Sequence, residues 1–330
     1  MITYSQSLAL MQQMAKVATT DTPNSALLVT LWNDSIRTVC NINGGKLRFL
    51  EAVKNMATVA GQEGYQTPNG FRKLMSIVIW SEATTAGVPY TPEMIFDPTI
   101  WNKIKQAKLG SGDLPLATYV EAQKFYIQPV PSTSGLLIQL RGRLQTNDLS
   151  IADYTTGTIV SVANGGTAVV GSGTTWTADM VGRYIRITQT TAANGGDGFW
   201  YQIGSYTSAT SIGLLKPYEG TTIAAGSAAY TIGQCSYIPE AYEMAPIYRA
   251  VAIFTGINDP THPEISKNWW RRYDGGQEIG ESKLVGGLIG QMLENEGETE
   301  EGAYVPPAGM NQSTGMAGPY YYPMQDASGF

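Results

Sequence analysis

The side chains that could carry acid–base or nucleophilic chemistry are few in this 330-residue chain. Its one histidine, His262, lies between Thr261 and Pro263, a setting typical of a surface turn rather than of a catalytic base. A Ser-His-Asp triad would need that histidine, and no Gly-x-Ser-x-Gly nucleophile elbow occurs. With one histidine and no Cys-x-x-Cys spacing, a zinc site is not expected either. The sequence therefore predicts no catalytic residue, no metal ligand and no cofactor-binding residue.

Two glycine-rich stretches come close to nucleotide-binding loops without matching them. Residues 171–176 begin like a dinucleotide loop, but Trp176 takes the place of the third glycine and no helix pattern follows. Residues 276–283 resemble a phosphate loop only loosely, because Lys283 does not directly follow the second glycine. Neither stretch predicts a nucleotide site.

Three carboxylates could serve a hydrolase. Glu240 and Glu243 could form a pair on one helix, although a solvated first helical turn is the more typical setting for them. A glycan-cleaving enzyme that used Glu240 with Asp179 would lack a matched pair. We predict that the chain is not an enzyme.

A cluster of aromatic and basic residues, Trp269-Trp270-Arg271-Arg272-Tyr273, is the best candidate for binding a partner. Adjacent residues on a helix point about 100° apart, so one tryptophan could fill a core while the other stays exposed. In one interpretation, the cluster anchors the core and places its arginines at the C-terminus of a helix, where cations interact favourably with the helix dipole. The alternative is an interface hot spot, for which Trp, Tyr and Arg are enriched. Both interpretations stay open.

The C-terminal region, residues 277–330, has a different composition from the rest. It has no Lys or Arg after Lys283, and it carries five glutamates from Glu294 to Glu301. Proline and tyrosine follow, and such a segment is typical of an extended or disordered arm that orders on a partner. Its candidate contact residues are the aromatic ones near its end: Tyr320, Tyr321, Tyr322 and Phe330.

Residues 155–235 predict a compact all-β module. Only six charged residues occur there, whereas glycine and threonine are abundant, which disfavours helices and suits strands. Asn164-Gly165 between two β-branched runs is a strong hairpin signal. In residues 183–186, Tyr184 alternates with Arg183 and Ile185 alternates with Arg186. This is the period of two that is expected of a half-buried strand. About six short strands separated by turns indicate a small sandwich or barrel.

The remaining elements predict a mixed body around this module. Helical spacing occurs over residues 4–17 and again from a cap at Asn24 or Ser25 to Gly44. Strands are expected at 71–80, 90–96 and 136–144, a hairpin at 116–126 and a short helix at 98–108. We place Leu74, Ser76, Val78 and Trp80 on one face of the strand at 71–80, and Met75, Ile77 and Ile79 on the other.

After the module, Pro239 and Glu240 favour the start of a long helix that Pro246 bends or delays. A second helix runs from His262 to Tyr273 and ends at Gly275. The fold class is therefore α+β: a helical-hairpin and mixed-sheet body with an inserted all-β sandwich or barrel and an extended C-terminal arm. The expected parts are the body at 1–154 and 236–276, the module at 155–235 and the arm at 277–330.

Composition and charge indicate which kinds of partner the chain is suited to contact. Charged residues make up 15% of the chain, well below the roughly 25% of an average soluble domain, so much of the surface is expected to face other protein. The net charge of −6 disfavours wrapping of nucleic acid. Basic residues gather at 103–108, at Arg141 with Arg143 and at Arg271 with Arg272, and we interpret them as solvated faces. Cys40 and Cys235 are expected to be free buried thiols. No export signal or membrane span is expected.

Several short stretches, taken together, resemble the neck proteins of tailed bacteriophages, the head-to-tail connector or adaptor class that includes the podophage tail tubular A-type proteins. The resemblance covers roughly residues 20 to 275. Before the module it rests on residues 64–68, 71–74 and 149–154; within the module on 173–177, 181–183 and 216–220; after it on 238–242.

The resemblance implies a structural virion protein, made in the host cytoplasm and placed in the virion at the neck, the head–tail interface. Its fold would assemble into a ring, usually a dodecamer, docked on the portal protein and joined below to the tail tube, nozzle or other neck proteins. Helices would form the ring body, β elements would face outward or toward the tail, and a terminal arm would reach the portal. Genomic DNA would pass through the channel during ejection without sequence-specific binding, and the acidic balance suits that passage.

A different class of function stays open beside this one. The β module could belong to a tail or baseplate protein and bind a host receptor. Trp200, Tyr201 and Tyr218 would then form an exposed stacking platform. The alternative, which we favour, places these three aromatic residues in the core of the module.

Overall fold

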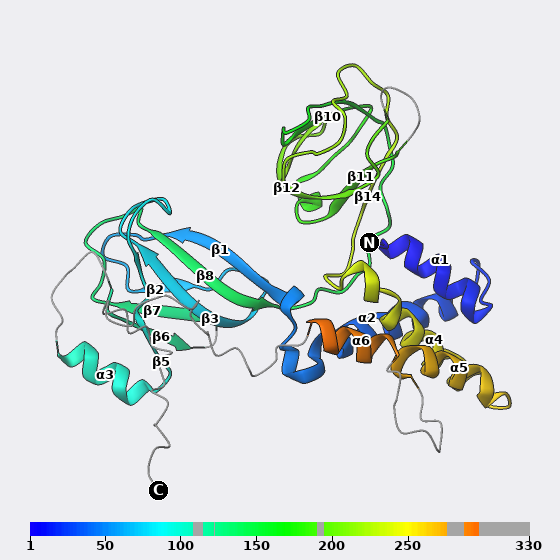
Figure 1. Ribbon diagram of the computed structural model, residues 1–330, viewed down its shortest axis with the longest axis horizontal. Coiled ribbons are helices and arrows are strands. Elements are labelled where there is room, and N and C mark those ends of the chain that lie inside the picture. Colours follow the sequence, from blue (N-terminus) through cyan, green and yellow to red (C-terminus); the bar gives the residue numbers. More distant parts are fainter. Residues whose placement is uncertain (108–114, 122, 190–194, 276–286, 297–330) are drawn as a thin grey trace, which may run out of the picture. The chain divides into compact units, whose positions relative to one another are not determined.

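The computed structural model describes residues 1–107, 115–121, 123–189, 195–275 and 287–296, and it confirms the α+β class (Figure 1). The described elements form three groups, each with its own buried core. We name them the helical part, the sheet body and the β module. The helical part comprises α1 (Tyr4–Ala15), α2 (Thr22–Asn41), α4 (Met244–Asn258), α5 (Pro263–Asp274) and α6 (Leu288–Glu296).

The helical part joins both sides of the chain in one core. Side chains of α1 and α2, such as Met11, Leu28 and Trp32, share a buried cluster with Val251 of α4 and Met292 of α6. Thr3 starts α1 through a capping box, in which its hydroxyl accepts from the Gln6 backbone N–H while the Gln6 side chain accepts from the Thr3 backbone N–H. Helices far apart in sequence therefore depend on each other for burial.

Two sequence predictions for the helical part need correction. The second helix begins at Thr22 and is capped by Asp21, whose carboxylate accepts from the Asn24 N–H, rather than by Asn24 or Ser25. Proline fits the first turn because no intrahelical partner is needed there. The extended arm predicted for residues 277–330 is wrong for its described portion, because α6 is a helix that buries Met292 and Ile289. The helical spacing of the apolar residues Leu288, Ile289 and Met292 was the sequence signal that could have predicted this helix. Residues 276–286 and 297–330 lie outside the described residues.

The helix expected after Pro239 is interrupted. A short 3₁₀ turn, η4 (Glu240–Tyr242), comes first, and α4 begins at Met244. Pro246 lies in the first turn of α4, where it needs no intrahelical partner, so it delays the helix instead of bending it. The predicted helix ending at Gly275 is confirmed: α5 closes there, with Gly275 in the left-handed conformation at φ 92°.

The sheet body contains two four-stranded sheets. One has the order β1-β8-β3-β4 and the other β2-β7-β6-β5. Their buried side chains include Tyr65, Ile77, Phe125 and Ile138. Trp101 of α3 stacks on Tyr119 beside the second sheet. The strands and helix of the body are β1 (Glu51–Ala57), β2 (Gly64–Gln66), β3 (Phe71–Trp80), β4 (Pro89–Tyr90), β5 (Glu93–Ile95), α3 (Pro98–Gln106), β6 (Ala117–Glu121), β7 (Lys124–Gln128) and β8 (Leu137–Leu144).

Bulges change the faces of β3. The register against β8 shifts between Phe71 and Lys73 and again between Leu74 and Ser76. Each extra residue reverses the alternation beyond it, so Leu74 is buried together with Ile77 and Ile79, and not beside Ser76 as the alternation predicted. The single strand expected at 90–96 is also wrong, because β4 and β5 pair in different sheets.

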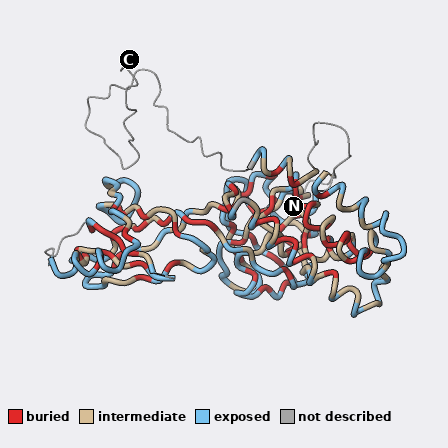
Figure 2. Tube along the Cα trace, turned by 90° about the horizontal axis from the view of Figure 1, so that it is seen from below, coloured by how far each residue is buried: buried red, intermediate tan, exposed pale blue. Residues whose placement is uncertain are grey.

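The β module is a curled sheet of six antiparallel strands in the order β14-β11-β12-β13-β10-β9. Isolated bridges from Ile159 to Ala228 and from Val162 to Ile223 connect β9 with the segment that leads into β14, which closes the sheet. The strands are β9 (Thr158–Val162), β10 (Ala168–Ser172), β11 (Tyr184–Ile187), β12 (Trp200–Ser208), β13 (Ser211–Leu214) and β14 (Tyr230–Gly233). Along β10, buried Val169 and Gly171 alternate with exposed residues. Figure 2 shows such buried and exposed stretches along the described parts of the trace.

Aromatic residues with satisfied polar groups fill the centre of the module. Trp176 is fully buried and its indole N–H donates to the Tyr230 hydroxyl at 2.9 Å. The Tyr230 hydroxyl in turn donates to the Thr156 carbonyl at 2.6 Å. The two rings meet edge to face with centroids 5.8 Å apart. Burial raises the pKa of Tyr230, so it stays a neutral donor.

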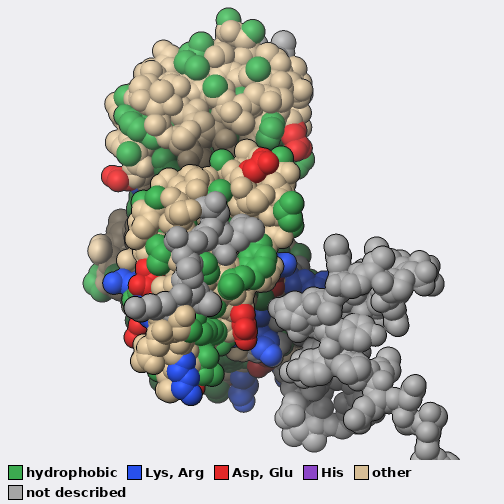
Figure 3. Space-filling model, turned by 90° about the vertical axis from the view of Figure 1, so that its left-hand side faces the viewer, with side chains coloured by type: hydrophobic (Ala, Val, Ile, Leu, Met, Phe, Trp, Pro, Cys, Tyr) green, Lys and Arg blue, Asp and Glu red, His purple; other side chains and the backbone are tan. Residues whose placement is uncertain are grey.

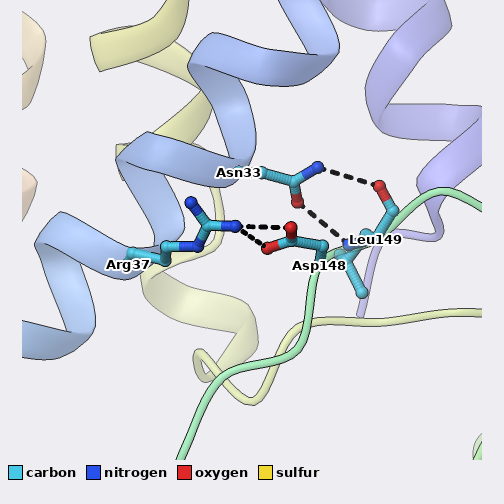
Figure 4. Close-up of polar contacts among 4 residues, drawn as sticks. All are labelled: Asn33, Arg37, Asp148 and Leu149. Atoms are coloured by element: carbon cyan, nitrogen blue, oxygen red, sulfur yellow. Dashed lines mark hydrogen bonds and ion pairs between the residues drawn. The ribbon is translucent and has the colours of Figure 1, made fainter.

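A clamp ties the segment before the β module to α2 (Figure 4). The Asn33 side chain donates to the Leu149 carbonyl at 3.0 Å and accepts from the Leu149 N–H at 2.9 Å. Both bonds are buried. Arg37, one turn further on, pairs with Asp148 at the surface. One amide side chain thus satisfies both backbone groups of a buried residue that belongs to no strand or helix.

Candidate interaction surfaces

The aromatic and arginine cluster of α5 packs on α4. Trp269 stacks on Tyr248 with ring centroids 5.7 Å apart. The Arg272 guanidinium lies 5.3 Å from the Trp269 ring centre and 5.8 Å from that of Tyr248. Trp270 meets Tyr273 edge to face at 5.6 Å. The cluster therefore presents one composite surface of flat rings under a cation.

The sequence allowed one tryptophan to fill a core while the other stays exposed, and the structure shows a different arrangement. Trp269 and Trp270 are both half-buried, and both pack against the helical core. Tyr273 is the buried member of the cluster, while Arg271 and Arg272 are exposed. Trp269 packs on Tyr248 of α4, while Trp270 packs on Tyr273 of its own helix. The interpretation as a partner interface stays a prediction, and Tyr320, Tyr321, Tyr322 and Phe330 lie outside the described residues.

His262 lies at the start of α5 and is exposed, as expected. Its Nδ1 lies 2.9 Å from Asp259 Oδ1 and 3.2 Å from Thr261 Oγ1. The hydrogen bond to Asp259 raises the pKa of His262 above its ordinary 6.5. A triad needs the nucleophile and the carboxylate on opposite ring nitrogens. Here both partners share one nitrogen, so the arrangement suits a helix start rather than a catalytic relay.

The carboxylates considered for hydrolysis lie in different settings. Glu243 is buried, and it accepts a hydrogen bond from the Ile2 N–H at 2.8 Å. Burial raises the pKa of Glu243. Glu240 is exposed and lies 3.2 Å from the Met1 amino group. Asp179 belongs to the 3₁₀ turn η3 (Ala178–Met180) of the β module. The two glutamates therefore hold the first two residues of the chain, Met1 and Ile2.

Both cysteines are free thiols. Cys40 is buried in the helical core, and burial raises its pKa to about 12. Cys235 is half-buried, and burial raises its pKa to about 12 as well. A thiol whose pKa is raised in this way is a poor nucleophile at neutral pH. Both behave as apolar packing groups.

The aromatic residues proposed as a receptor platform divide between core and surface. Tyr201 and Tyr218 are buried in the module, as we favoured. Trp200 is half-buried on the outer face, where the Arg186 guanidinium lies 4.8 Å from its ring centre. On the face drawn in Figure 3, the surface of the module carries few charged side chains. Trp200 is thus the one member of the proposed platform that solvent reaches within the described residues.

Exposed apolar side chains occur on every group of elements. In the sheet body several of them surround β5, an edge strand of its described sheet. Phe96 directly follows β5 and is 66% exposed. The Glu93 N–H of β5 donates to the carbonyl of Leu116, whose side chain is half exposed. An edge strand flanked by exposed apolar groups is a template for pairing with another chain. The exposed large apolar residues are Val53, Val59, Val88, Phe96, Ile100, Leu116, Ile151, Val170, Val181, Phe199, Tyr206, Leu215, Ile257 and Ile265.

A cationic cleft, which the sequence patterns did not predict, forms where α2, β3 and β8 end or begin. Two adjoining hollows of about 260 and 230 Å³ share Leu50, Arg72 and Leu144 in their linings. Lys73 and Arg143 line the first hollow, and Arg37 lines the second. Neither lining includes an Asp or a Glu. The two linings therefore bring together four basic side chains, Arg37, Arg72, Lys73 and Arg143, in a chain of net charge −6.

Local backbone structure creates this cleft. The first bulge of β3 makes Arg72 the extra residue opposite the Leu144–Arg143 step. Arg72 thereby reaches across to α2 and donates to the side-chain oxygen of Asn41. Gly45, at φ 75°, lies so close that a Cβ there would meet the Arg72 guanidinium at 3.1 Å. Arg143 is buried, which corrects the expectation that Arg141 and Arg143 lie together on a solvated face. The adjacent basic residues Arg72 and Lys73 were the sequence signal for this cleft. The signal could not be used without the pairing of β3 with β8, which places them beside Arg143.

The described residues contain no group of three or more His, Cys, Asp or Glu side chains that could hold a metal ion. None of the helices that the structure describes is both long and apolar enough to cross a membrane. No protein-family model matches the chain, and a search of the curated proteins found no match.

Proposed function

We propose that this chain is a structural virion protein, a head-to-tail adaptor whose copies form a ring that joins the portal to the tail and lines the DNA exit channel. The observation that carries the proposal is the distribution of exposed apolar side chains over all three groups of elements. Several separate surfaces suit a subunit that contacts sister copies on two sides and other virion proteins above and below.

The side chains considered for acid–base chemistry are engaged by neighbouring residues. His262 lies beside its own turn residues, and Glu240 and Glu243 hold Met1 and Ile2. The short motifs that resemble phage neck adaptors supply the specific assignment. The half-exposed rings of α5 and the edge strand β5 are the surfaces we assign to subunit contacts.

The experiment that tests this proposal measures assembly and location. The purified full-length chain is examined by light scattering and by negative-stain electron microscopy, and its copy number is determined in purified virions. We expect closed rings, because matching heterologous faces close into a cycle. The resemblance to neck adaptors implies about twelve copies per ring. Virions should carry the same number at the neck. A chain that stays monomeric beside its capsid components would contradict the proposal.

A second candidate function is recognition of a host receptor by the β module. Trp200 favours it, because its ring lies on the outer face beneath Arg186, with Phe199 68% exposed next to it. A partly exposed aromatic ring offers a large, rigid contact area to a binding partner. Binding of the full chain to host cells, lost in Trp200→Ala but kept in Val181→Ala, would favour this function. Unchanged cell binding in Trp200→Ala would exclude this surface.

A further inference from the structure

The cationic cleft has the chemistry of a site for carboxylates. Arg72 and Lys73 are both exposed at its mouth, and the bond that Arg72 makes to Asn41 leaves its charge uncompensated because the Asn41 side chain is neutral. The charge of Arg37 is offset by Asp148. An arginine with free N–H groups in a hollow of this size binds a carboxylate through two parallel hydrogen bonds.

The same chain contains a segment that matches this chemistry. From Glu294 to Glu301, five of eight residues are glutamate, and no Lys or Arg follows Lys283. Residues 298–301, Glu-Thr-Glu-Glu, belong to the region outside the described residues. No other stretch of the sequence has as many acids in as few residues. Charge complementarity therefore selects this segment as the partner of the cleft.

We propose that the cleft at Arg72 and Lys73 binds the acidic segment 298–301 of a second copy of the chain. The inference rests on the self-association that the proposed function requires, and it names the contact that would link neighbouring subunits. Copies joined head to tail in this way use two different surfaces per subunit, the cleft and the acidic segment, which is the geometry that closes into a ring.

The test uses the full-length protein in a mixture of unlabelled and ¹⁵N-labelled chains. A carbodiimide, which joins an amine directly to a carboxylate, should couple Lys73 to Glu298, Glu300 or Glu301. Mass spectrometry of the digest should find these links in peptides of mixed isotope, which only two different chains can produce. Arg72→Glu should lower the yield of mixed-isotope links by about tenfold, since a like charge then faces the segment. Lys124→Glu, an exposed residue of β7 outside both linings, makes the same change of charge and should leave the yield unchanged.

Sedimentation of the same samples separates the two proposals. Rings without links at Lys73 would overturn the docking site and leave the adaptor function standing. Links confined to peptides of one isotope would show that the segment does not come from a second copy and would overturn the inference. Monomers without links would overturn both proposals. A chain in which Glu298, Glu300 and Glu301 are all changed to lysine should assemble again when mixed with an Arg72→Glu/Lys73→Glu chain.

Discussion

The β module and the helical part bury comparable cores by opposite routes. The module takes its whole core from residues 159–232, and most of its strands pair with strands close in sequence. The helical part takes its core from Met11 through Met292, so that α4 packs on α1 and α2 across the entire insertion. The module is therefore locally encoded, whereas the helical part exists only when two distant segments meet. This difference explains how a charge-poor β unit can be inserted without disturbing the helices.

The largest expected loss of stability tests whether the core of the β module unfolds independently of the core of the helical part. Trp176→Ala removes a fully buried ring and its bond to Tyr230, and should lower the free energy of unfolding of the module by about 3–5 kcal/mol. Hydrogen exchange should then speed up in β9–β14 while α2 and α4 stay protected.

The matched variant in the helical part is Leu28→Ala, which empties a fully buried site at a cost of about 2–5 kcal/mol. The rate of amide hydrogen exchange should rise together in α1, α2 and α4, since these helices share one core. Exposed Phe199→Ala is the control for the module. Equal loss of protection in both regions after Trp176→Ala would show that the module and the helices unfold as one unit.

A smaller effect is expected at the clamp that links the two regions. Asn33→Ala leaves the buried N–H and carbonyl of Leu149 without their partner, which should cost about 2–3 kcal/mol in urea unfolding. Arg37→Ala, one helical turn away, removes an exposed ion pair and should cost about 0–1 kcal/mol. A cost at Arg37 that matches the cost at Asn33 would mean that charge, rather than buried hydrogen bonding, holds this segment to α2.

The smallest effect concerns the start of α5. The hydrogen bond to Asp259 raises the pKa of His262 above 6.5, so this contact contributes stability that is fully present below pH 6.5. The contribution is lost as the pH rises through the raised pKa. In Asp259→Asn, nuclear magnetic resonance titration should return the pKa of His262 toward 6.5. An unchanged pKa would show that Glu264, which also raises it, is the main cause.

Much of the fold could be predicted from the sequence because the signals were local. Amphipathic spacing predicted α1, α2, α3 and α5, and the β-branched, glycine-rich composition predicted the β module. The α+β class followed from these elements. The helix α6 was missed because glutamates and glycines on both sides dominated the composition of its surroundings.

The sequence by itself determined where most of the described helices and strands form, because propensity and spacing act over a few residues. Only the tertiary structure decided what these residues meet. The bulges of β3, which bury Leu74 and turn Arg72 toward α2, depend on its pairing with β8, about seventy residues later. The half-burial of both Trp269 and Trp270 depends on the packing of α5 on α4. Register and packing are long-range, and a cleft made by three distant segments has no local pattern from which it could be predicted.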